Sequence, residues 1–123
     1  MKRLENKVAV VTGVGSGIGK AIANAFADEG ASLGIGDINE DLLSKTTDSL
    51  KTKTDKIMSI KTDVSSEDQV KKLIDETVNT YGKLDIIVNN VSVAIGGYPI
   101  TDMSNEDWQK IIAINFSSVF YGC

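Results

Sequence analysis

A short apolar run followed at once by closely spaced glycines constrains the fold of this chain more than any other feature. The run is Val8 to Val11, too short for a helix but long enough for a strand buried on both faces, as in a parallel sheet. Ile18, Ile22 and Phe26 then recur every fourth residue, which is typical of one face of a helix. This segment therefore predicts a strand, a glycine turn and a helix.

The glycine turn has the chemistry of a phosphate-binding site. The first turn of a helix has free backbone N–H groups and a partial positive charge, and glycine, lacking a Cβ atom, lets a phosphate come close. The spacing is Thr-Gly-x-x-x-Gly-x-Gly, and the commoner dinucleotide pattern G-x-G-x-x-G is absent. A turn that only packs helix against strand is the alternative. The candidate binding residues here are Thr12, Gly13, Gly15, Ser16, Gly17, Ile18 and Gly19.

This spacing resembles the cofactor loop of the short-chain dehydrogenase/reductase family, and the resemblance runs from Lys7 to Gly122. It implies an NAD(H)-dependent oxidoreductase acting on a small secondary alcohol or ketone. It corresponds to the first half of a family member only. The family's catalytic serine and its Tyr-x-x-x-Lys pair have no counterpart in these 123 residues, so we expect the chain alone to be inactive, as a truncated form would be.

Composition excludes several other classes of protein. The 123 residues, 41% of them hydrophobic and 24% charged, suit a single globular domain over residues 1–123. The net charge of −4 and the dispersed basic residues argue against a nucleic-acid partner. No apolar run is long enough to span a membrane, so we expect no membrane partner. The one cysteine suits a reducing cytoplasm. Without histidine, His-based triads and His-ligated metal sites are impossible, and we expect no metal.

An acidic residue ends the second expected strand, residues 32–37. Asp37 lies 24 residues after Gly13, where dinucleotide-binding folds hold the adenosine ribose by its 2′-hydroxyl. A carboxylate there would repel the 2′-phosphate of NADP, and neither Ser16 nor Ile38 supplies a cation for it. The prediction is that NAD is preferred over NADP, with Asp37 and Ile38 as contacts. The alternative is an ordinary turn residue.

Two further strands are expected to end in polar candidates. Asp63 and Val64 follow the strand at 57–62, and the resemblance implies that Asp63 lies beside the adenine ring; a cap before the next helix is the equal alternative. Asn89 and Asn90 follow the strand at 84–88, and their position beside the glycine loop predicts that they lie at the cofactor. Paired asparagines at a strand end can instead satisfy loop backbone groups. The family's usual Asn-Asn-Ala-Gly is Asn-Asn-Val-Ser here, so Val91 stands where a small residue normally contacts the cofactor.

The last expected helix carries the one catalytic candidate. Its segment I-N-F-S-S-V-F resembles a family helix in which the asparagine supports a water linked to the active-site lysine, which implies that role for Asn115. The alternative is a helix residue that hydrogen-bonds locally. Phe116, Val119 and Phe120 make the helix apolar on more than one face, so we expect a homo-oligomer, dimer or tetramer, formed through it.

These predictions combine into a three-layer αβα sandwich with a Rossmann-type, doubly wound parallel sheet. The strands near 8–12, 32–37, 57–62 and 84–88 should lie in the order 3-2-1-4, and the sheet should be incomplete on its C-terminal side.

Besides the oxidoreductase, two functions stay open. One is a catalytically inactive chain that binds a nucleotide or a partner. The other is a different adenosine-binding α/β domain, such as a methyltransferase, in which Asp37 would hold the ribose equally well.

Overall fold

Four parallel strands form one sheet in the order β3-β2-β1-β4 in the computed structural model of the chain, which describes residues 2–95 and 97–123. The order and the parallel pairing confirm the prediction. β1 lies between β2 and β4, with Val10 paired to Gly34 on one side and to Ile87 on the other. The strands are β1 (Val8–Thr12), β2 (Ser32–Asp37), β3 (Ile57–Lys61) and β4 (Ile86–Val88).

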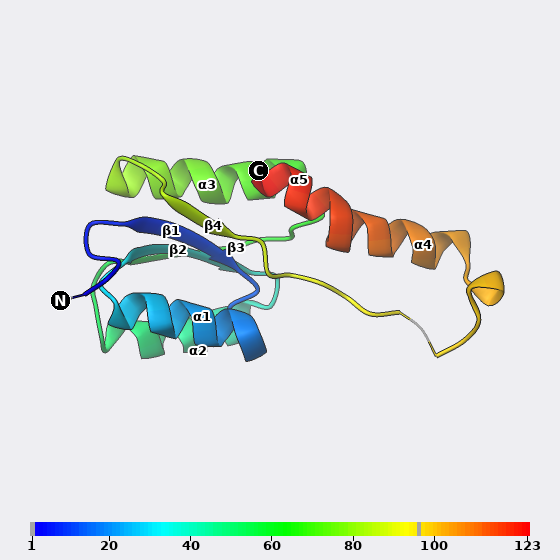
Figure 1. Ribbon diagram of the computed structural model, residues 1–123, viewed down its shortest axis with the longest axis horizontal. Coiled ribbons are helices and arrows are strands. Elements are labelled where there is room, and N and C mark those ends of the chain that lie inside the picture. Colours follow the sequence, from blue (N-terminus) through cyan, green and yellow to red (C-terminus); the bar gives the residue numbers. More distant parts are fainter. Residues whose placement is uncertain (1, 96) are drawn as a thin grey trace.

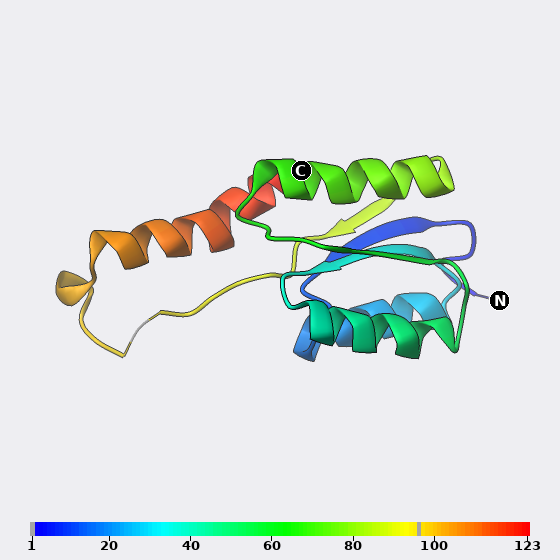
Figure 2. The same ribbon diagram turned by 180° about the vertical axis from the view of Figure 1, so that it is seen from behind.

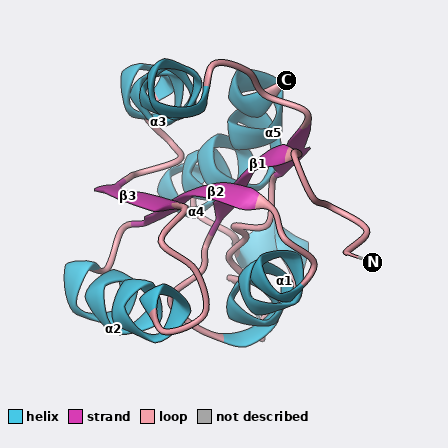
Figure 3. Cartoon of the chain, turned by 90° about the vertical axis from the view of Figure 1, so that its left-hand side faces the viewer, coloured by secondary structure: helices cyan, strands magenta, loops and turns pink. Residues whose placement is uncertain are grey.

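Helices cover both faces of this sheet, which confirms the three-layer sandwich. Figure 3 shows α1 and α2 together on one face and α3 with α5 on the other. The remaining helical segments lie beyond the carboxyl ends of the strands, where the chain runs outward after β4 (Figures 1 and 2). The helices are α1 (Gly17–Asp28), α2 (Glu40–Lys51), α3 (Glu67–Tyr81), α4 (Asn105–Ile111) and α5 (Ser118–Gly122), with a 3₁₀ turn at Ile100–Asp102.

The last helix differs from the expectation because its middle is not α-helical. Between α4 and α5, residues Ile112–Ser117 form a π-helical segment, a wider form that is often found at functional sites. The segment contains Asn115, whose side chain bonds to the backbone of Val93 instead of staying within the helix. The sequence pattern of apolar residues does not distinguish such a segment from an ordinary helix.

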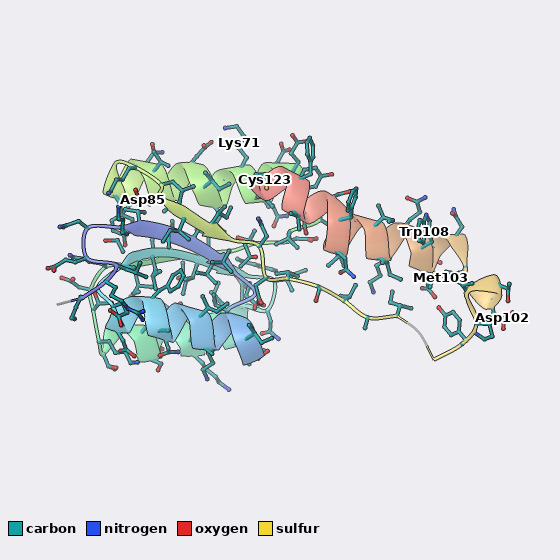
Figure 4. The ribbon with its side chains drawn as sticks, viewed as in Figure 1. Lys71, Asp85, Asp102, Met103, Trp108 and Cys123 are labelled. Carbon is teal, nitrogen blue, oxygen red and sulfur yellow. The ribbon has the colours of Figure 1, made fainter. Side chains whose placement is uncertain are left out.

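The fourth strand is shorter than predicted and begins at Ile86 instead of residue 84. The reason is Asp85, whose carboxylate Oδ2 accepts a hydrogen bond of 2.8 Å from the Val8 backbone N–H. The Asp85 carboxylate therefore takes the place that a backbone carbonyl would have in the hydrogen bonding between β1 and β4. Figure 4 shows Asp85 near the end of the sheet that lies opposite the outward-running chain.

The glycines within β2 are explained by a helix that packs closely against the strand. A Cβ atom at Gly34 would overlap the hydroxyl of Thr77 on α3, and one at Gly36 would lie 2.9 Å from the Cδ2 atom of Leu73 on α3, as well as 2.8 Å from the Thr62 hydroxyl beyond β3. The close neighbours of both glycines are therefore protein side chains. The core on either side consists of fully buried side chains such as Val10, Leu33 and Leu73.

No helix among residues 2–95 and 97–123 is both long and apolar enough to cross a membrane.

Candidate cofactor site

The glycine turn joins β1 to α1 at the carboxyl edge of the sheet. Gly13 and Gly17 have φ angles of +70° and +59°, which favour glycine. A Cβ atom at Gly19 would overlap the carbonyl oxygen of Gly13, so this glycine lets α1 lie against the turn. Around Gly17, by contrast, a Cβ atom would meet nothing within 4 Å. The turn therefore packs tightly between Gly13 and Gly19 and leaves open space at Gly17, where α1 begins.

Ser16 and Ile18 lie at the exposed rim of this turn. Ser16 is the N-cap of α1, but its side chain makes no capping hydrogen bond. Ile18 is 73% exposed. Both side chains are thus free to contact a ligand at the start of the helix.

The carboxylate of Asp37 lies directly beside the glycine turn. Its Oδ2 accepts a hydrogen bond of 2.9 Å from the Gly15 N–H, and its Oδ1 accepts one of 2.8 Å from the Asn39 N–H. The residue is half-buried at the end of β2, next to the exposed Ile38. The structure therefore brings together the two sequence features, the acid and the glycine turn, from which a dinucleotide site was predicted.

A pocket of about 130 Å³ opens beside Asp37, between the carboxyl ends of the strands and the π-helical segment. Apart from the two acids its wall is largely apolar, as expected for a site that holds a flat ring system with a few polar contacts. Five of its lining residues were predicted as cofactor contacts. The lining residues are Asp37, Ile38, Thr62, Asp63, Val64, Val91, Val93 and Ile114.

Asp63 stabilises the turn before α3 and also lines the pocket. Its Oδ1 accepts hydrogen bonds from the backbone N–H and the hydroxyl of Ser65, at 2.9 and 2.6 Å, which stabilises the turn before α3. The same residue lines the pocket. The N-cap of α3 itself is Ser66, three residues after Asp63. A turn-stabilising acid and a ligand contact are therefore compatible at this position.

The two asparagines after β4 lie in different surroundings. Asn90 belongs to the glycine turn, since its side-chain Nδ2 donates to the Gly13 carbonyl at 3.3 Å and its backbone N–H donates to the Thr12 hydroxyl at 3.1 Å. Asn89 instead packs against α5, where a Cβ atom at Gly122 would overlap its Oδ1 atom. Of the pair, only Asn90 contacts the turn.

Thr12 and Val91 complete the edge of the turn nearest to β4. The Thr12 hydroxyl, almost fully buried, also donates to the Val88 carbonyl at 3.3 Å. Val91 lines the pocket, and a Cβ atom at Gly13 would come within 3.0 Å of its Cγ2 atom. Val91 is larger than the alanine that is usual in the resembled family, and it fits here because Gly13, which lies opposite, has no side chain.

Asn115 holds the chain that follows β4. Its Oδ1 accepts from the Val93 N–H and its Nδ2 donates to the Val93 carbonyl, both at 2.7 Å. These paired bonds join the π-helical segment to the pocket wall, where Val93 and Ile114 both lie. The role that the resemblance implied for Asn115, support of a water near a lysine, stays a prediction.

The tyrosines with shifted pKa values are poorly suited to donate a proton. The hydrogen bond that the Tyr98 hydroxyl donates to the Asp107 carboxylate, 2.8 Å long, raises the pKa of Tyr98. Burial, together with the nearby Asp55, raises the pKa of Tyr81. A general acid near neutral pH needs a lowered pKa instead, so neither residue replaces the Tyr-x-x-x-Lys pair.

Within residues 2–95 and 97–123, no three acidic or cysteine side chains gather as a metal site would require.

Sequence reasoning missed three residues of the pocket, Thr62, Val93 and Ile114. Thr62 directly follows β3, so its position at a strand end was the one available signal. Val93 and Ile114 carry no such signal, because the bonds between Asn115 and Val93 that join their two segments appear only in the folded chain.

A family model described as short chain dehydrogenase matches residues 7–123. The chain belongs to the short chain dehydrogenase family. This confirms the resemblance that the glycine turn and the asparagines indicated, and the match covers every strand and helix described above.

Relatives within the short chain dehydrogenase family match the chain over nearly its whole length. It is 40% identical to 3beta-hydroxysteroid dehydrogenase 2 of Eggerthella lenta over 119 residues, covering 97% of the chain and 46% of the relative. It is 39% identical to a 3-oxoacyl-[acyl-carrier-protein] reductase of Thermotoga maritima, covering 96% of the chain and 48% of the relative.

The crystal structure of a short chain dehydrogenase/reductase from Burkholderia phymatum in complex with NAD has a TM-score of 0.93 at 35% identity. The match covers 99% of this chain and 43% of that one. The chain thus spans less than half the length of each of these three relatives.

Proposed function

We propose that the chain is the NAD(H)-binding part of a short chain dehydrogenase and that residues 1–123 form a single domain for this purpose. The observation that carries the proposal is the 2.9 Å hydrogen bond between the Gly15 N–H and Asp37, which brings the phosphate-binding turn and the ribose-binding acid together. The relative from Burkholderia phymatum, whose structure is in complex with NAD, supports the same cofactor class.

Each part of the cofactor has a candidate set of residues in this chain. The open space at Gly17 and the N–H groups at the start of α1 suit the pyrophosphate. The Asp37 carboxylate suits the adenosine ribose, and the apolar pocket with Ile38, Val64 and Asp63 suits the adenine ring. Asn90 and Val91, at the β4 side of the turn, suit the nicotinamide half. The bound cofactor supplies or accepts a hydride.

A preference for NAD over NADP is part of the proposal. The 2′-phosphate of NADP would bring negative charge next to the Asp37 carboxylate, and the side chains at the rim of this site, Ser16 and Ile38, carry no cation. Calorimetric titration of both cofactors tests this preference. We expect NAD(H) to bind more tightly and Asp37→Ala to narrow the difference; equal affinities in the wild-type chain would contradict the argument.

The proposed reaction is hydride transfer between the cofactor and a small secondary alcohol or ketone. Asn115 is the one member of the family's catalytic group that the resemblance places here. Proton transfer needs a tyrosine with a lowered pKa beside a lysine, and the 123 residues contain no Tyr-x-x-x-Lys. We therefore expect these residues by themselves to bind cofactor without turnover. The family match favours neither a methyltransferase nor a solely partner-binding role.

We also propose a homo-oligomer and a cytoplasmic location. Phe116 and Phe120 on the last helix are 72% and 75% exposed, and apolar side chains in such a row suit contact with a second copy. The single cysteine suits a reducing compartment.

A further inference from the structure

The peptide group between Val14 and Gly15, within the glycine turn, is held from both sides. Its carbonyl oxygen accepts a hydrogen bond of 3.1 Å from the hydroxyl of Thr46 on α2. Its N–H group, on Gly15, donates to Asp37 at the end of β2 at 2.9 Å. Two residues outside the turn thus bond to opposite ends of one peptide group.

The bond from Thr46 is unlike those of the other buried threonines on the helices. Thr47 and Thr77 donate to the carbonyl four residues earlier in their own helix, to Leu43 and Leu73, at 2.7 Å each. Thr46 instead donates to a different element, and its side chain is 1% exposed. The hydroxyl therefore bonds to the glycine turn in a place that water does not reach.

The carbonyl that Thr46 bonds to needs this partner. Val14 is fully buried, and a buried carbonyl without a hydrogen bond is costly. Gly15 also packs against α2, since a Cβ atom there would lie 2.8 Å from the Cβ of Leu42. Without the Thr46 hydroxyl, the carbonyl would gain a partner only by rotation of the peptide group toward water.

Such a rotation would break both bonds together. A peptide group is planar, and its carbonyl and N–H point in opposite directions, so turning one away from Thr46 turns the other away from Asp37. A carbonyl oxygen directed toward the ligand would also repel a phosphate group. The bond from the Thr46 hydroxyl thus favours the orientation of the peptide group that also bonds to Asp37.

We propose that Thr46 is a positioning residue for the nucleotide diphosphate site, which acts by fixing the orientation of the Val14–Gly15 peptide. This inference rests on the proposed cofactor function. Thr46 does not line the pocket, and its hydroxyl bonds to the glycine turn, so its effect on the cofactor would pass through the turn.

The test compares Thr46→Val, which removes the hydroxyl and keeps the shape, with Thr47→Val, which removes a hydroxyl bonded only within α2. NADH affinity is measured by fluorescence titration, and exchange of the Gly15 amide hydrogen is measured by NMR on the protein without cofactor. We expect Thr46→Val to weaken NADH binding about tenfold and to speed exchange at Gly15, since losing a buried hydrogen bond costs on the order of a tenfold change. Thr47→Val should leave both unchanged.

Thr46→Ser keeps the hydroxyl and should restore both values, while Thr46→Ala replaces the valine variant if that variant does not fold. Unchanged exchange and affinity in Thr46→Val would overturn the proposal, as would a serine variant that behaves like valine. If the wild-type chain bound no NADH while Gly15 exchange still rose in Thr46→Val, the contact with the turn would stand and the cofactor function would fail.

Discussion

Adding a single methyl group at Gly19 should destabilise the chain, although alanine normally favours a helix. The new Cβ atom would overlap the Gly13 carbonyl oxygen and lie 2.5 Å from the Asn90 Nδ2 atom. The Asn90 side chain is flexible, but the Gly13 carbonyl is part of the backbone. The N–H of Gly13 is itself bonded to the Gly36 carbonyl at 2.8 Å, which holds this part of the turn in place. The overlap therefore has to be relieved by moving α1 away from the turn.

The size of the effect is the difference between two opposing terms. Overpacking of this kind costs about 3 kcal/mol at the upper end of its usual range. Alanine in a helix is favoured over glycine by about 1 kcal/mol. The net loss in free energy of unfolding for Gly19→Ala should thus be about 2 kcal/mol.

Urea unfolding followed by circular dichroism measures this loss, with Gly82→Ala as the matched control. Gly82 ends α3 with a φ of +83° and nothing within 4 Å of a built Cβ atom, so its substitution carries only the backbone cost of about 1 kcal/mol. NADH affinity should fall in Gly19→Ala and stay unchanged in the control. A Gly19→Ala chain as stable as wild type would refute the packing argument.

Three further perturbations test other parts of the structure. Gly17→Val should abolish NADH binding in a titration, because the side chain would occupy the open space proposed for the pyrophosphate and alter a φ of +59°; a folded variant with normal binding would contradict this. The hydrogen bond from the Val8 N–H holds the pKa of Asp85 below its ordinary value of 3.8. The ionised Asp85 therefore stabilises the fold above that pH, and this stabilisation is lost as the pH falls through the lowered pKa. In Asp85→Asn the free energy of unfolding should fall less steeply as the solution is acidified. An unchanged slope would contradict a stabilising role for the Asp85 carboxylate. Replacing Phe116 and Phe120 by serine should reduce self-association in light scattering, and a wild-type chain that is a dispersed monomer would contradict the proposed oligomer.

Local chemistry explains why the main features of the fold could be predicted from the sequence. A short apolar run before glycine, as at Val8 to Val11, specifies a buried strand and a turn without reference to the remaining chain. Asp37 was predicted to hold the adenosine ribose because it ends the second strand, 24 residues after Gly13, and the structure brings it within 2.9 Å of the Gly15 N–H. The order β3-β2-β1-β4 followed from the resemblance and is confirmed.

Only the tertiary structure distinguished residues that are neighbours in the sequence. Successive side chains along an extended segment point to opposite sides, so the pairing of β4 with β1 decided that Asn90 contacts the turn and Asn89 packs against α5. Successive residues on a helix also point in different directions, so the packing of α2 decided that Thr46 contacts the glycine turn and Thr47 does not. A sequence pattern records the type of each side chain and its spacing, whereas such contacts depend on the partner that folding places opposite.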